Sequence, residues 1–96
     1  MTKPTRIGVV GGGQLARMLQ PELTALGAQM IILDPDPNSP ASANADGQVL
    51  GAYHDSAALF ELAQQCDVLT VELEDVGVET LAQIRDQGTP VYPDPD

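Results

Sequence analysis

Hydrophobic positions follow two periodicities along the chain, and together they predict five strands and three helices. Short apolar runs with little alternation are typical of strands that are covered on both faces of a sheet. The stretches with strand character are residues 6–11, 28–33, 48–53, 67–73 and 90–92. Apolar residues recur with the spacing of a helix between the first and second stretches, between the third and fourth, and between the fourth and fifth. This alternation predicts a parallel sheet with helices on both faces and right-handed crossovers.

The first helix is predicted to begin at Gln14. Its apolar positions fall on one helical face: Leu15, Met18, Leu19, Leu23 and Leu26. Pro21 interrupts this pattern and is expected to kink or break the helix. Gly27 is a suitable C-terminal stop.

Two further helices have recognisable ends. Asp55 or Ser56 can cap a helix whose apolar face carries Leu59, Leu62, Ala63 and Cys66, with Cys66 as a packing residue. Asp75 can cap the third helix, which runs through Arg85 and stops at Gly88. We expect the strand order 3-2-1-4-5, which is a Rossmann-like α/β arrangement with an open parallel sheet, in a single domain that spans residues 1–96.

The segment 34–46 stands apart from these elements. Its thirteen residues, DPDPNSPASANAD, contain three prolines and have no apolar periodicity. We predict a loop, and its length makes a functional role worth testing.

Charge and cysteine content narrow the function classes. Fourteen acidic residues against four basic ones give a net charge of −10, which disfavours binding to the phosphate backbone of nucleic acids. Cys66 is the only cysteine, so an internal disulfide is excluded and a reducing, cytoplasmic location fits best. No apolar run has the ~18 residues that a membrane span needs. No His/Cys/Asp cluster suggests a metal site, and His54 reads as a surface loop residue.

Two polar features are expected to meet at one crevice. In a sheet of this order, ligands bind at the carboxyl ends of the strands where the order reverses, between the first and fourth strands. The first strand leads into Gly11, Gly12 and Gly13, and the fourth leads into Glu72 and Glu74. The two glutamates share the same parity along the chain. They are either ligands for sugar hydroxyls or an exocyclic amine, or solvated loop charges.

The glycines match a dinucleotide-binding pattern, which leaves the ligand open. Gly11, Gly13 and Ala16 fit G-x-G-x-x-A, in which absent side chains and free helix-terminal amides favour an anion. Alternatively, the glycines only permit a tight turn from strand to helix. Arg17 is either a partner of that anion or a solvated surface residue. Asp34 follows 23 residues after Gly11, where a nicotinamide or flavin site has its ribose-binding carboxylate. Because Asp34 precedes a proline, it is equally suited to start a turn.

Three blocks of the sequence resemble one enzyme family in order and spacing. GVVGGGQLARML, ILDPDPNSPAS with AD shortly after, and CDVLTVELEDV are similar to the N-terminal domain of the N5-carboxyaminoimidazole ribonucleotide synthetases, also called the ATPase subunit of phosphoribosylaminoimidazole carboxylase. The blocks cover nearly the whole chain. Ala16 stands where the family usually has Gly, and Asp75 stands where Asn is common.

The resemblance implies an ATP-grasp ligase of purine biosynthesis. Such an enzyme activates bicarbonate with ATP and carboxylates the amino group of aminoimidazole ribonucleotide. It implies that this domain forms one wall of the ribonucleotide site through Gly12, Gly13, Gln14, Leu15, Glu72 and Glu74. It also implies that ATP and Mg bind in ATP-grasp domains absent from this chain, that the fragment alone is inactive, and that a homodimer forms.

Two other functions remain open at this point. One is the dinucleotide-binding half of an NAD-dependent oxidoreductase, which depends on Gly11, Gly13, Ala16 and Asp34. The other is a non-catalytic ligand-sensing or interaction module.

Overall fold

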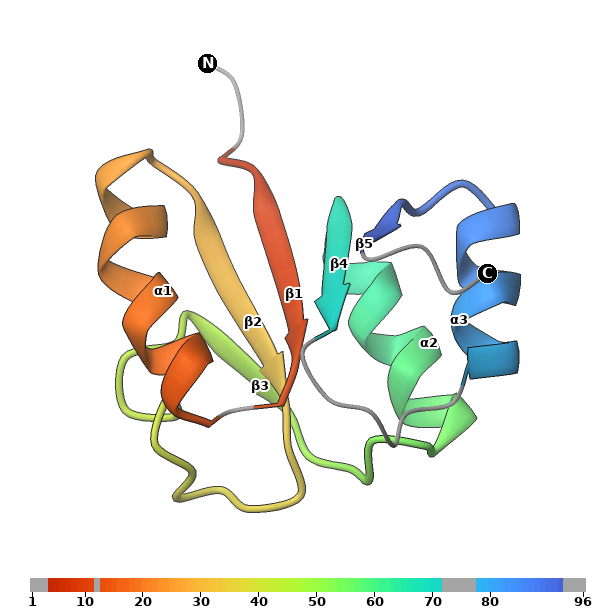
Figure 1. Cartoon of the computed structure of the whole chain (residues 1–96), viewed down its shortest axis with the longest axis horizontal. Helices are drawn as coiled ribbons and strands as arrows, with labels where there is room; N and C mark the ends of the chain where they lie inside the picture. Colours follow the sequence, from red (N-terminus) through yellow and green to blue (C-terminus); the bar gives the residue numbers. More distant parts are fainter. Residues whose placement is uncertain (1–3, 12, 72–77, 93–96) are drawn as a thin grey trace.

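A computed structural model describes residues 4–11, 13–71 and 78–92, and it contains the predicted five strands and three helices. In chain order they are β1 (Arg6–Val10), α1 (Gln14–Ala25), β2 (Gln29–Leu33), β3 (Gly47–Val49), α2 (Ser56–Gln65), β4 (Val68–Val71), α3 (Val78–Asp86) and β5 (Val91–Tyr92). All strand pairs are parallel, and the order β3-β2-β1-β4-β5 confirms the predicted one (Figure 1).

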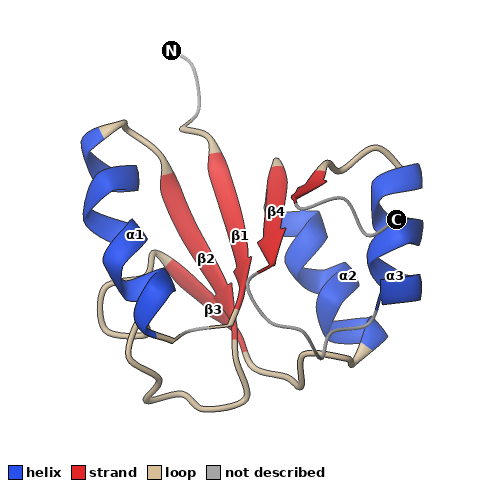
Figure 2. Cartoon of the chain, viewed as in Figure 1, coloured by secondary structure: helices blue, strands red, loops and turns tan. Residues whose placement is uncertain are grey.

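The sheet has α1 on one face and α2 and α3 on the other (Figure 2), and an apolar cluster lies on each face. Successive strand residues point to opposite faces, so Val9 and Val10 belong to different layers. On one face α2 and α3 pack through Leu59, Leu62, Leu81 and Ile84 against Val10, Ile31, Leu33, Leu69 and Val91. On the other face α1 packs against a smaller cluster that contains Val9, Met30, Ile32 and Ala41. The core is therefore asymmetric, with its larger part under α2 and α3.

Several helix ends lie where the sequence predicts them. Asp55 is the N-cap of α2, and its carboxylate accepts hydrogen bonds from the backbone N–H of Ala57 (3.0 Å) and Ala58 (3.3 Å). Gly27 and Gly88 follow α1 and α3 with φ of +79° and +111°, as C-terminal glycines do. Asp75, the predicted cap of the third helix, lies outside the described residues.

Helix α1 differs from its prediction in its orientation. It continues through Pro21 as one helix, so of the two predicted outcomes, a kink or a break, the break is absent. Among the α1 residues whose side chains the structure describes, Ala16 is fully buried, whereas Met18 is 69% exposed and Leu26, at the C-cap, is 82% exposed. With 3.6 residues per turn, Leu23 lies on the same side as Ala16, while Met18 points away. The small Ala16 side chain contacts the sheet, and this orientation leaves Met18 in solvent.

The third strand is shorter than predicted, because the chain turns after Val49. A Cβ on Gly51 would lie 2.6 Å from Cβ of Ala58, so this part of the loop passes closely over the start of α2. Segment 34–46 forms successive turns, as predicted for a loop, and it contributes Ala41 to the core. None of the described helices is long and apolar enough to cross a bilayer.

Candidate functional site

The strand order reverses between β1 and β4, which is where the sequence predicts a crevice. The two strands are parallel neighbours, and Val10 pairs with Val71 at their carboxyl ends. In Figure 1 both arrows point to the same edge of the sheet, which is the edge from which α1 begins. The glycine turn therefore leaves the sheet beside the residue that precedes Glu72 in the sequence. Glu72 and Glu74 themselves lie outside the described residues, as does Gly12.

Gly11 and Gly13 are glycines for different reasons. Gly11 is buried with φ of +113°, a conformation that favours glycine, and its N–H donates to the carbonyl of Leu33 at 2.8 Å. Gly13 has an ordinary φ of −79° and serves as the N-cap of α1 without a side-chain cap. A Cβ built on Gly13 would meet nothing within 4 Å in the described part of the chain. The backbone geometry thus accounts for Gly11, while Gly13 faces open space.

Helix α1 starts directly after this turn. Gln14 and Leu15 are its first two residues, and the carbonyl of Gly13 accepts from the N–H of Arg17 at 3.0 Å. The first N–H groups of a helix lack partners within the helix and favour negatively charged groups. Arg17, at the end of the first turn, is exposed.

Asp34 has a structural role at the same edge. The residue is 5% exposed, and both carboxylate oxygens accept hydrogen bonds from the chain itself. The N–H of Asp36 donates to Oδ1 (2.9 Å) and the hydroxyl of Tyr53 donates to Oδ2 (2.7 Å). Of the two readings of Asp34, the turn is therefore the observed one. These bonds compete with the grip on a ribose that a dinucleotide site requires.

Tyr53 was not among the site candidates from sequence. It lies in the loop between β3 and α2, half-buried against the larger core layer. Its only sequence signal is a hydroxyl-bearing aromatic residue at the end of the predicted third strand, residues 48–53. Its partner Asp34 lies nineteen positions earlier in the chain, directly after another strand, and becomes apparent only from the fold. His54, the next residue, is exposed in this loop as predicted.

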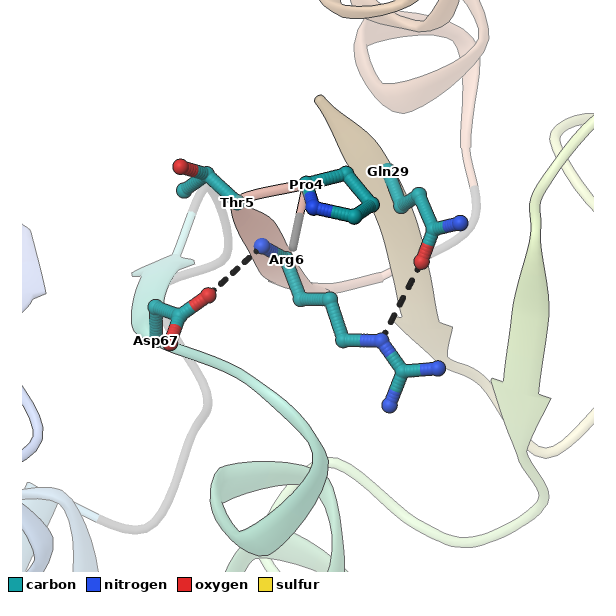
Figure 3. A pocket seen from close by; sticks show the side chains of 5 residues that line it. All are labelled: Pro4, Thr5, Arg6, Gln29 and Asp67. Atoms are coloured by element: carbon teal, nitrogen blue, oxygen red, sulfur yellow. Dashed lines mark hydrogen bonds between the residues drawn. The ribbon is translucent and has the colours of Figure 1, made fainter. Parts of the chain in front are cut away.

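A cavity lies at the opposite, amino edge of the sheet. It has a volume of about 590 Å³ and is lined by Pro4, Thr5, Arg6, Gln29 and Asp67 (Figure 3). The N–H of Arg6 donates to Oδ2 of Asp67 at 2.8 Å, and Nε of Arg6 donates to Oε1 of Gln29 at 3.1 Å. These polar groups join β1 to β2 and to the start of β4. We interpret the cavity as a consequence of these hydrogen bonds between neighbouring strands. It lies away from the predicted crevice.

Cys66 confirms its predicted packing role, although at the end of a helix and not within it. It is the C-cap of α2, half-buried against the larger core layer. Burial raises the pKa of its thiol from 9.0 to about 11; the nearby Arg6 charge opposes this rise, and the Asp67 charge adds to it. The thiol is therefore protonated at neutral pH and unsuited to act as a nucleophile.

Comparison with known proteins gives a consistent family. The family described as the ribonucleotide synthetase preATP-grasp domain matches residues 4–96. The N5-carboxyaminoimidazole ribonucleotide synthase of Synechococcus elongatus is 44% identical over 89 residues, covering 93% of this chain and 22% of that protein.

Solved structures agree with the sequence relatives. The crystal structure of N5-carboxyaminoimidazole ribonucleotide synthetase from Thermotoga maritima has a TM-score of 0.90 at 38% identity, covering 95% of this chain and 25% of its own. The N5-carboxyaminoimidazole synthase of Aspergillus clavatus, solved with ADP and 5-aminoimidazole ribonucleotide, has a TM-score of 0.83 at 38% identity, covering 97% of this chain and 25% of its own.

The chain thus spans about a quarter of the length of these relatives. The family match along residues 4–96 and the similarity to solved structures point to the same family. The chain belongs to the family of ribonucleotide synthetase preATP-grasp domains, as the N-terminal domain of the N5-carboxyaminoimidazole ribonucleotide synthetase type.

Proposed function

We propose that this chain is the ribonucleotide-side domain of an ATP-dependent ligase that forms N5-carboxyaminoimidazole ribonucleotide from aminoimidazole ribonucleotide, bicarbonate and ATP. The observation that carries the proposal is the family match over residues 4–96. It is supported by a relative with the same fold that was solved together with ADP and 5-aminoimidazole ribonucleotide. The NAD-dependent alternative is set aside, because the family is a ligase family and the Asp34 carboxylate is engaged by the chain's own groups.

The proposed contacts come from the two segments that follow β1 and β4. Gly12, Gly13, Gln14 and Leu15 present backbone amides, and Glu72 and Glu74 accept hydrogen bonds from hydroxyl or amino groups. Two observations support this assignment: the Val10–Val71 pairing of the preceding strands and the open space next to Gly13. Gly13 lets a ligand approach the backbone at a point where the fold itself does not require a glycine.

ATP and Mg are proposed to bind outside this chain, in ATP-grasp domains of a longer polypeptide. Lys3 is the only lysine in the sequence, and the described residues include no group of three or more His, Cys, Asp or Glu that could hold a metal ion. These observations support the proposal that this chain contributes a wall of the substrate site and that the nucleoside triphosphate binds elsewhere. We accordingly propose that the isolated chain is inactive. When bound, ATP would supply the phosphoryl group that activates bicarbonate.

The assembly and location follow as further parts of the proposal. Met18, Leu26, Leu50 and Tyr92 are large apolar residues with exposed side chains, and such surface favours contacts with other domains or with a second copy. We propose a homodimer of the complete enzyme in the cytoplasm.

A hybrid enzyme tests the proposal. Residues 1–96 are joined to the remaining domains of the Synechococcus elongatus relative, and ligation is measured with aminoimidazole ribonucleotide, bicarbonate and ATP. Glu72→Ala and Glu74→Ala should each weaken ribonucleotide binding and leave ATP binding nearly intact. Loss of one charge-assisted hydrogen bond costs about 1.5–3 kcal/mol, roughly ten- to a hundredfold in affinity.

The matched control is Glu61→Ala, which removes the same charge from an exposed position on α2. It should leave both affinities unchanged. If both glutamate variants bind the ribonucleotide as tightly as the control does, the assigned roles are wrong. A hybrid that folds and binds ATP but not the ribonucleotide would reject the proposed function itself.

A further inference from the structure

We infer that Asp34 and Tyr53 form a clamp that positions the glycine turn for the ribonucleotide without contacting the ligand. The inference rests on the proposed function of the turn, and it assigns a role to two residues outside the proposed contact set. The clamp is defined as the 2.7 Å hydrogen bond from the Tyr53 hydroxyl to Oδ2 of Asp34.

Asp34 is fixed to the end of β3 by hydrogen bonds of its backbone. It directly follows β2, and its backbone joins the end of β3: its N–H donates to the carbonyl of Val49 (3.2 Å), and its carbonyl accepts from the N–H of Gly51 (3.4 Å). Nε2 of Gln48 also donates to the carbonyls of Asp34 (3.2 Å) and Asp36 (3.0 Å). The start of the loop 34–46 is thus fixed to β3 by several bonds.

The clamp joins the end of β2 to the larger core layer through Tyr53. Tyr53 comes from the next loop along the sheet edge, between β3 and α2, and its ring packs against the larger core layer. Its hydroxyl therefore ties the end of β2 to a part of the chain that the core already holds. A hydrogen bond to a buried carboxylate is among the stronger ones in proteins.

The glycine turn is hydrogen-bonded to the residue next to the clamp. The N–H of Gly11 donates to the carbonyl of Leu33 at 2.8 Å, and Leu33 immediately precedes Asp34. The first residue of the glycine turn is thus held by a hydrogen bond to the end of β2. A displacement of Asp34 moves the carbonyl that anchors Gly11, and with it the amides at the start of α1. Ligand affinity is sensitive to such shifts, because binding groups must be held close to their productive geometry.

The hybrid enzyme described above separates positioning from a purely structural role. We expect Tyr53→Phe and Asp34→Ala each to raise KM for the ribonucleotide roughly three- to tenfold, the effect of one lost hydrogen bond. We expect kcat and KM for ATP to stay within about twofold, since neither depends directly on this hydrogen bond. The double variant should be no worse than Asp34→Ala, because both substitutions break the same bond.

Asp34→Asn is the conservative rescue. Its amide oxygen can still accept from the N–H of Asp36, and its amide nitrogen can donate to the Tyr53 hydroxyl oxygen. It should restore KM close to the parent value. The matched control is Asp67→Ala, which removes a carboxylate that accepts a backbone hydrogen bond at the opposite edge of the sheet, from Arg6. This control should lose stability without any change in KM.

Three results would overturn the inference. One is a Tyr53→Phe enzyme in which kcat falls while both KM values stay unchanged, which indicates loss of folded protein alone. Another is an Asp34→Asn enzyme as impaired as Asp34→Ala, which indicates that the ligand needs the charge itself. If the parent hybrid fails to bind the ribonucleotide, the proposed function is wrong. The clamp is then tested on its own by the amide NMR spectrum of the 96-residue chain. Unshifted Gly11 and Gly13 resonances in Tyr53→Phe would then overturn it.

Discussion

At the scale of single residues, Gly8 and Cys66 show how one missing side chain makes room for another. A Cβ on Gly8 would lie 2.5 Å from Cδ2 of Leu69, 2.9 Å from Sγ of Cys66 and 3.2 Å from Cγ of Leu62. The space beside β1 is therefore filled by α2 and by the start of β4. Cys66 is held there by packing, and the same packing keeps its thiol neutral.

The buried thiol predicts slow alkylation. The pKa of Cys66 is raised from 9.0 to about 11, so at pH 8 its thiolate fraction is about a hundredfold below that of an unperturbed thiol. We expect iodoacetamide to modify the native chain at least about a hundredfold more slowly than the chain in urea, with the native rate rising up to about pH 11. Equal rates would contradict the burial of this group, and Cys66→Ser is the blank.

The same shift fixes the direction of a pH effect on stability. The folded state holds the Cys66 proton more tightly than the unfolded state does. Its contribution to the free energy of unfolding is therefore complete below pH 9 and is lost as the pH rises through about 11. Between these two values, Cys66→Ser should show a weaker decline in stability than the parent chain.

At the scale of elements, α1 shows what a periodic pattern leaves undecided. Its existence and its start at Gln14 follow from the spacing of apolar residues, and both are confirmed. The orientation of the helix does not follow from this spacing, because Ala16 contributes little to a hydrophobic pattern and yet is buried against the sheet. A close approach between a helix and a sheet selects the smallest side chain, so the sequence signal for it is weak.

Pro21 predicts a gain in helix stability on substitution. Proline lacks the N–H that would donate to the carbonyl of Arg17, and it costs about 3 kcal/mol in a helix interior. Pro21→Ala frees the unfolded chain, which offsets about 0.4–1 kcal/mol. We expect the free energy of unfolding in urea to rise by about 2–2.6 kcal/mol. Glu22→Ala, at an exposed position of the same helix, should change it by less than about 0.5 kcal/mol. Loss of stability in Pro21→Ala would show that the rigidity of proline is needed here.

At the scale of the whole molecule, the sheet order was predictable and the clamp was not. Right-handed crossovers and alternating elements leave few arrangements for five strands, and the observed order is among them. That order also brings the carboxyl ends of β1 and β4 to one edge. The Asp34–Tyr53 bond instead depends on how two loops fold over that edge, and no periodicity in the sequence encodes it.

The charge of the chain predicts how salt affects its stability. The net charge is −10, and among the described residues the one ion pair joins Arg85 to the adjacent Asp86. Repulsion between acidic groups therefore opposes folding with little compensation. The screening length falls from about 30 Å at 0.01 M salt to about 3 Å at 1 M. These lengths lie on either side of the 12.2 Å radius of gyration, so salt should remove most of the repulsion across the molecule.

We therefore expect Tm to rise with NaCl between these concentrations at pH 7. A gain of about 1 kcal/mol corresponds to roughly 4–8 °C for a domain of this size. Replacing two exposed acids, Glu61→Lys and Glu79→Lys, should raise Tm at low salt and reduce the salt effect, because the net charge then becomes −6 by the gain of two units at each position. Glu61→Gln with Glu79→Gln should give about half that change. A Tm that falls as salt increases would mean that attraction outweighs repulsion: the hydrogen bonds of Arg6 at the amino edge, or pairs like Arg85–Asp86, would then contribute more than the excess of negative charge costs.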